Sequence, residues 1–61
     1  MAAIKLKVGD RVRLYRKDKD SVWPIGTEGI VVNIFDKWNF VYIKDSSGFY
    51  QYIYSHCLAH A

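Results

Sequence analysis

The sequence predicts an all-β domain, folded as a single small antiparallel barrel of about five strands that spans residues 1–61. Three observations support this prediction. Short segments rich in β-branched and aromatic residues alternate with turn residues, and no segment has the length and period of a helix. Hydrophobic residues make up 51% of the chain, which is enough for a core. The chain has only 61 residues, so it forms one domain whose stability we expect to be marginal.

The first segments alternate with a period of two residues. Residues 4–8 alternate apolar and basic side chains, which is typical of a half-buried edge strand. A Gly-Asp turn separates them from a second alternating segment, residues 11–15. In that strand Val12 and Leu14 are expected to face the core, and the outward side chains are Arg11, Arg13 and Tyr15.

The middle of the chain contains a polar loop, a glycine-hinged turn and a central strand. Residues 16–23 show no period and are interpreted as a loop. Gly26 and Gly29 bracket the turn, because glycine tolerates positive φ and close backbone approach. Residues 30–35 follow as a strand that is apolar on both faces. The face that points inward stays open, since a strongly bent strand could use both.

The last part of the chain predicts a hairpin of residues 38–44 and 49–54. A two-residue loop would mix aliphatic side chains with tyrosines on one face. A three-residue loop ending at Gly48 pairs Ile43 with Gln51 and separates the two kinds, so we predict this register. On the other face it places Tyr42 opposite Tyr52, Phe40 opposite Tyr54 and Lys44 opposite Tyr50.

A short 3-10 turn over residues 55–58 and a short last strand at residues 59–61 complete the prediction. Cys57 in that turn is expected to be a small buried hydrophobic residue. The predicted core consists of Ile4, Leu6, Val8, Val12, Leu14, Ile30, Val32, Ile34, Val41, Ile43, Ile53 and Leu58.

The net charge of +3 is concentrated at the start of the chain. Residues 1–20 carry seven basic and three acidic side chains, a balance of +4, whereas residues 21–61 carry two basic and three acidic ones, a balance of −1. Such a patch attracts anionic partners. The alternative is a solvated face that only keeps a small protein soluble.

Other features restrict the class of protein. The single cysteine excludes an internal disulfide and favours a cytoplasmic location, and no apolar run approaches the ~20 residues of a membrane span. His56, Cys57 and His60 are one ligand short of a structural zinc site. We therefore expect no metal and no cofactor. No nucleophile, base and orienting group stand out together, so we expect no enzymatic activity.

The best candidate site is a surface that combines basic residues with outward-facing rings. Such rings can stack with nucleic-acid bases or hold a partner peptide. The alternatives are that the 16–23 loop covers the rings or that a second copy of the chain does. The candidate residues for binding nucleic acid or a protein partner are Arg11, Arg13, Tyr15, Arg16, Lys17, Lys19, Trp38, Phe40, Tyr42, Tyr50, Tyr52 and Tyr54.

Two motifs resemble those of SH3-like barrels, in particular the KOW type. Residues 8–13 read Val-Gly-Asp-Arg-Val-Arg, and residues 25–34 hold a Gly-x-x-Gly turn followed by a strand. The resemblance implies a small barrel that binds RNA or proteins. Residues 12–16 also look similar to photosystem I subunit IV, a non-catalytic subunit that docks on other proteins. Type II dihydrofolate reductases share the 9–13 opening and Gln51.

These observations lead to three hypotheses for the function. The first is a module that binds RNA or DNA through the basic strand and loop and the tyrosine-rich hairpin. The second is an adaptor that docks on a larger protein complex through the same face. The third, more remote, is an oligomeric reductase-like enzyme with a pore lined by Gln51. A homo-oligomer formed through the aromatic face is compatible with the sequence.

Overall fold

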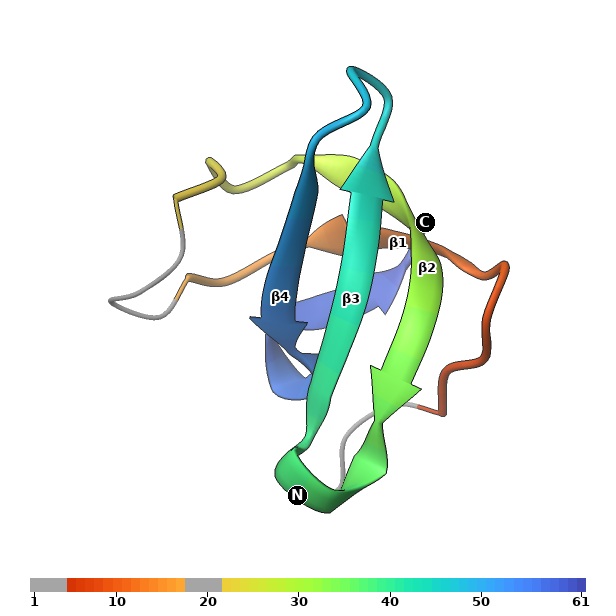
Figure 1. Ribbon diagram of the computed structural model, residues 1–61. Helices are drawn as coiled ribbons and strands as arrows, with labels where there is room; N and C mark the ends of the chain where they lie inside the picture. Colours follow the sequence, from red (N-terminus) through yellow and green to blue (C-terminus); the bar gives the residue numbers. More distant parts are fainter. Residues whose placement is uncertain (1–4, 18–21) are drawn as a thin grey trace.

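The computed structural model describes residues 5–17 and 22–61, which form a single antiparallel sheet of five strands (Figure 1). A 3-10 turn precedes the last strand, as the sequence predicts. The all-β prediction is therefore confirmed. The strands are β1 (Arg11–Leu14), β2 (Glu28–Phe35), β3 (Phe40–Asp45), β4 (Tyr50–Tyr54) and β5 (Leu58–His60), and the 3-10 turns are η1 (Asp36–Trp38) and η2 (Ser55–Cys57).

The sheet has the order β4-β3-β2-β1-β5 and is not closed into a barrel. β4 and β5 are its two edges, although they are adjacent in the chain. The three residues of η2 carry the chain from one edge to the other, so that β1 and β5 run across the back of β3 and β4 (Figure 1). The predicted barrel closure is therefore wrong. β1 and β5 form one layer and β3 and β4 form the other, and no hydrogen-bonded ladder joins the edge strands β4 and β5.

A bulge in β2 allows the sheet to fold over on itself. The register with β3 shifts between Val31 and Asn33, so Val31 pairs with Ile43 and Ile34 pairs with Val41. Val31 is buried and Ile34 is half-buried against the core, although their odd spacing would place them on opposite faces of a regular strand. β2 thus packs side chains from both of its apolar faces against the core, Val31 from one and Ile34 from the other. The sequence alone left open which face points inward.

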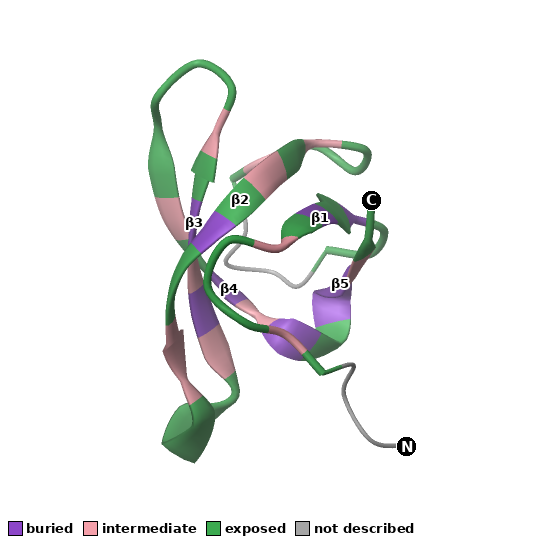
Figure 2. Ribbon diagram, turned by 90° about the vertical axis from the view of Figure 1, so that its right-hand side faces the viewer, coloured by how far each residue is buried: buried purple, intermediate pink, exposed green. Residues whose placement is uncertain are grey.

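The core lies between the two layers, where Figure 2 shows the buried segments. Six of the predicted core residues are buried, and Cys57 is buried as expected. The prediction is wrong for Val8, Ile30 and Val32, which are exposed; Leu6 and Ile34 are only partly buried, and Ile4 lies outside the described residues. The buried residues are Val12, Leu14, Val31, Val41, Ile43, Ile53, Cys57 and Leu58, together with Ser55.

The predicted edge strand at residues 4–8 does not form in its described part, residues 5–8. Gly9 has a φ of +97° and redirects the chain just before β1. The Lys7 amide donates a hydrogen bond to the Asp10 carboxylate, which closes this turn. Only Leu6 of the segment packs on the core, so the alternation reflects one partly buried side chain and no strand pairing.

The β3–β4 hairpin has the predicted register, with Ile43 opposite Gln51 and Tyr42 opposite Tyr52. Its loop ends at Gly48, which has a φ of +89°. The Asp45 carboxylate accepts hydrogen bonds from the backbone amides of the loop at 2.9 and 3.0 Å. The sequence therefore specifies the hairpin through its turn as well as through its two faces.

Candidate binding surface

Aromatic side chains gather on the face of the hairpin that points away from the core. Because side chains alternate along a strand, Val41 and Ile43 of β3 face the core while Phe40 and Tyr42 face outward. In β4, Ile53 is buried and the tyrosines at positions 50, 52 and 54 share the outward face. The register then brings the rings of the two strands directly opposite one another.

The rings form one continuous line, which we call the aromatic row. Tyr42 stacks between Tyr50 and Tyr52, with ring centroids 5.1 and 4.5 Å apart. Phe40 meets Tyr52 edge-on at 6.4 Å and stacks on Tyr54 at 4.4 Å. The row is defined as Tyr50, Tyr42, Tyr52, Phe40, Tyr54 and, at its end, His56, whose ring stacks on Tyr54 at 5.4 Å.

This packing determines what the row offers to a ligand. The ring faces inside the row are covered by neighbouring rings, so it presents mainly ring edges and tyrosine hydroxyls. Tyr50 and Tyr52 are 49% and 58% exposed, whereas Tyr42 and Tyr54 are half-buried. Tyr50 ends the row, so one of its faces has no ring of the row against it. The row is therefore an ordered surface whose open ring faces lie at its margins.

A shallow apolar hollow of about 360 Å³ lies beside the row. It is lined by Phe35, Trp38, Phe40 and Tyr52. Phe35 contacts Tyr52 with ring centroids 5.9 Å apart, and Trp38 at the end of η1 is 60% exposed. The lining consists of aromatic side chains, so the hollow suits a flat apolar group and offers little hydrogen-bonding specificity.

Two lysines place positive charge over rings at the two ends of β3. The Lys44 ammonium lies 5.7 Å from the centre of the Tyr50 ring, and the Lys37 ammonium lies 5.5 Å from that of Trp38. Both distances are in the range of cation–π attraction. β3 is six residues long, so the two lysines mark a surface roughly 20 Å in length.

Sequence reasoning placed five of its candidate rings correctly in the row and Trp38 beside it. Its candidate residues did not include Phe35, His56, Lys37 or Lys44, although the predicted register places Lys44 opposite Tyr50 on this face. Phe35 and Lys44 had a signal in the sequence, because each lies at a strand end that the register pairs with an aromatic residue. Lys37 and His56 sit in 3-10 turns, whose side-chain directions follow from no simple period.

Tyr15 does not belong to the row. It is half-exposed just after β1, and its hydroxyl donates a hydrogen bond of 2.9 Å to the His56 carbonyl oxygen. Its backbone amide donates to the Cys57 carbonyl at 3.0 Å. Tyr15 therefore fastens η2 to the end of β1, and η2 in turn positions His56 at the end of the row.

The predicted basic strand is exposed, but its charge is partly compensated. The side chains of Arg11 and Arg13 lie 3.4 and 3.5 Å from the Glu28 carboxylate oxygens, because β1 and β2 pair in register there. Arg16 and Lys17 are exposed beyond β1, and Lys19 lies outside the described residues. One carboxylate thus reduces the positive potential of the two β1 arginines.

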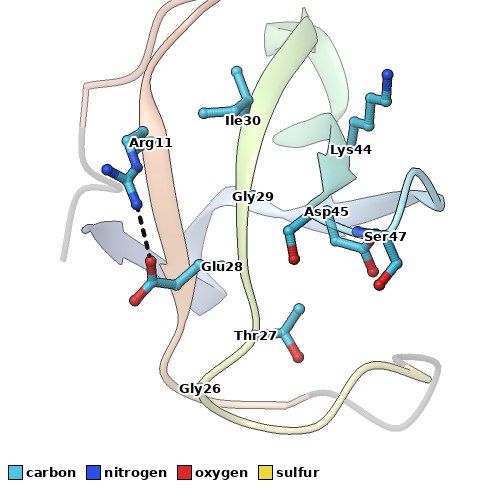
Figure 3. A pocket seen from close by; sticks show the side chains of 10 residues that line it. Arg11, Gly26, Thr27, Glu28, Gly29, Ile30, Lys44, Asp45 and Ser47 are labelled. Atoms are coloured by element: carbon cyan, nitrogen blue, oxygen red, sulfur yellow. Dashed lines mark hydrogen bonds and ion pairs between the residues drawn. The ribbon is translucent and has the colours of Figure 1, made fainter.

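A larger hollow of about 660 Å³ opens between the β2 start and the hairpin loop (Figure 3). Its charged side chains are Arg11, Lys44, Glu28 and Asp45. Figure 3 shows the Arg11–Glu28 ion pair at one side and Asp45 beside Ser47 at the other. The charges are mixed and both carboxylates already have partners, so this hollow lacks the features of an anion site.

The side chains of His56, Cys57 and His60 have different surroundings and do not form one cluster. His60 Nε2 lies 3.0 Å from the Lys5 carbonyl oxygen, Cys57 is buried, and His56 stacks in the row. Within residues 5–17 and 22–61, no three His, Cys, Asp or Glu side chains form a group that could hold a metal ion. Gln51 lies on the core-facing side of β4, half-buried, opposite the tyrosine face.

In the described part of the chain, no helix has the length and apolar character needed to cross a membrane. Comparison with known proteins gave no match to a family model, to a curated protein or to a solved structure. The geometry of the surface is therefore the basis for a functional proposal.

Proposed function

We propose that this protein is a non-enzymatic module that binds single-stranded nucleic acid on the aromatic row and the adjoining hollow. The observation that supports the proposal is the exposed line of rings with a lysine at each end. Surfaces that combine stacking rings with cations bind single strands in a sequence-tolerant way.

The geometry suggests how a strand would lie. One base enters the hollow between Trp38 and Tyr52, and another lies against the exposed Tyr50 ring once the Lys44 side chain turns toward a phosphate. Lys37 and Lys44 meet the phosphates near these two points. Because the hollow is lined by aromatic rings, its preference among bases would depend on stacking and not on hydrogen-bond readout.

The finer assignment of the fold belongs to the same proposal. We infer that this chain is related to SH3-like barrels of the KOW type. In this chain the sheet keeps two open edges, β4 and β5. The relationship is supported by the Gly9-Asp10 turn that leads into β1 and by the Gly26 turn before β2, where Gly26 has a φ of +98°. A cytoplasmic location, based on the single cysteine, is also part of the proposal.

Titration of a labelled oligonucleotide at increasing salt tests the proposal. For a single strand, log K falls with log salt by about 0.7 for each phosphate neutralised. Lys44→Gln is expected to reduce this slope by about 0.7, while the matched control Lys7→Gln, in the loop before β1, leaves it unchanged. Trp38→Ala removes a stacking ring and should weaken binding by about 1–3 kcal/mol.

Docking on a protein complex is the second candidate, and two observations favour it. The inner rings of the row already stack on one another, and Glu28 compensates Arg11 and Arg13. Docking on a protein surface uses ring edges, hydroxyl groups and complementary shape, and it does not require ring faces that are free for stacking. Capture of a partner that survives nuclease treatment, together with no salt-dependent oligonucleotide binding, would replace the first candidate by this one.

A further inference from the structure

The outer edge of β4 carries backbone groups that point away from the sheet. At one end of the hairpin the Asp45 amide donates to the Phe49 carbonyl at 2.8 Å, and at the other the Ser55 amide donates to the Asn39 carbonyl at 2.8 Å. Hydrogen-bonded and non-hydrogen-bonded residue pairs alternate along an antiparallel ladder. The hydrogen bonds at the two ends of the hairpin predict the same alternation for the residues between them. The amides and carbonyls that point outward are those of Tyr50, Tyr52 and Tyr54.

Within β4 itself, the usual sequence features that protect an edge from pairing with another chain are absent. β4 is five residues long, contains no charged residue and no proline, and pairs with β3 without a bulge. The opposite edge, β5, has only three residues. Tyr54 is the N-cap of η2, and the carbonyl of an N-cap residue accepts the first hydrogen bond of its turn. Among the described residues, no turn, loop or cap backbone hydrogen bond outside η2 reaches the other outward groups of β4.

We propose that two copies of this chain associate through β4, paired antiparallel about a two-fold axis at Tyr52. The strand reads Tyr-Gln-Tyr-Ile-Tyr and is nearly symmetric about its centre. In this register Tyr52 faces its own equivalent, and Tyr50 faces Tyr54 of the second copy. Because the Tyr54 carbonyls belong to η2, the remaining outward groups form about four backbone hydrogen bonds.

The chemistry of β4 fits a second copy of itself. In an isologous interface residue i meets residue j and j meets i, so a charge at the position on the axis, Tyr52, would meet the same charge of the second copy. β4 has no charge, and opposed tyrosines are favourable cross-strand pairs. The pairing would also place the two aromatic rows side by side in one surface of double width. The dimer does not depend on which ligand that surface binds.

Sedimentation equilibrium of the full chain, from about 1 to about 500 µM, tests the association. We expect the mass to rise from the 7.1 kDa of one chain to twice that value. Tyr52→Lys should remain a monomer throughout, because it places two lysines directly opposite. Val8→Lys adds the same charge at an exposed site away from the strands and should dimerise like the wild type.

Cysteine cross-linking tests the register independently of affinity. Opposed residues in a bonded pair have Cα atoms about 5.5 Å apart, which a disulfide can span. Tyr52→Cys should therefore form a covalent dimer on mild oxidation. Tyr50→Cys and Tyr54→Cys should do so only when mixed with each other. The wild-type chain, whose single cysteine is the buried Cys57, measures the background level of cross-linking.

Three results would overturn the proposal. One is a wild-type chain that is monomeric at the highest concentration. The second is a dimer that Tyr52→Lys leaves intact, and the third is a Tyr50→Cys variant that cross-links with itself as readily as Tyr52→Cys. Circular dichroism of Tyr52→Lys shows whether that chain is folded, and if it is not, the cross-linking result decides. Each readout is a mass, so failure to bind nucleic acid would leave this test unaffected.

Discussion

Replacing Gly29 by alanine tests the packing between β2 and β3 directly. Gly29 pairs with Val12 of β1 and with Asp45 of β3, so its backbone is held on both sides. A Cβ atom there would lie 2.5 Å from Ile43 Cγ2 and 2.8 Å from the Lys44 carbonyl oxygen. The second neighbour is backbone, which cannot turn away as a flexible side chain could.

The cost can be estimated from these contacts. Overpacking of a well-packed site costs about 1–3 kcal/mol. Replacing glycine returns about 0.4–1 kcal/mol through the unfolded chain. The net loss is about 1.3 kcal/mol at the middle of these ranges, out of the ~3–9 kcal/mol expected for a chain of this length. The melting temperature should then fall by about 5–10 °C.

Urea and thermal unfolding followed by tryptophan fluorescence measure this loss. Gly48→Asn is the matched control, since it also adds a side chain at a glycine, but nothing lies within 4 Å of the added Cβ. Asparagine tolerates the positive φ of that loop position, so we expect a change below about 0.5 kcal/mol. Equal effects of the two substitutions, or a stabilised Gly29→Ala protein, would refute the close approach of β2 to β3.

Three further predictions concern single side chains. Asp45→Ala removes the acceptor for two loop amides and should cost about 1–2 kcal/mol in urea unfolding, whereas Asp45→Asn keeps an acceptor oxygen and should recover most of it. Glu28→Gln breaks two exposed ion pairs, so stability should change by less than about 1 kcal/mol, while oligonucleotide affinity at low salt should rise as the arginines are released. Leu14→Ala empties a fully buried site and should cost about 2–5 kcal/mol, enough to leave much of the chain unfolded by circular dichroism; Val8→Ala, at a site the sequence also assigned to the core, should be neutral because Val8 is exposed.

The hairpin could be predicted in detail because independent signals agreed on it. Glycine at the last loop position, an aspartate at its start and the separation of aliphatic from aromatic side chains all specify the same register. A shift of one residue would have moved Ile53 out of the core. The burial of Val12 and Leu14 followed in the same way from strict alternation in β1.

The predictions that were wrong, or that stayed open, are those in which one sequence pattern is compatible with two structures. Lys5 to Val8 alternates like a strand, but the positive φ of Gly9 turns this segment away from the sheet. The bulge in β2 also had a sign in the sequence, which is the polar Asn33 within an apolar strand. Its side chain accepts a hydrogen bond from the Ile34 amide at 2.9 Å, where the register shifts. Closure of the barrel depends on the path of η2, which no local pattern encodes.

The aromatic row itself is a compromise between stability and availability. Its inner rings, such as Tyr42, hold their neighbours in place, so they stabilise the hairpin and lose little freedom when a ligand binds. Tyr50 at one end of the row and Trp38 in the hollow beside it are at the margins of the surface, and both lie next to a lysine. A substitution inside the row therefore changes folding and binding together. A substitution at the margin changes binding alone, and it is at the margins that a functional role can be separated from a structural one.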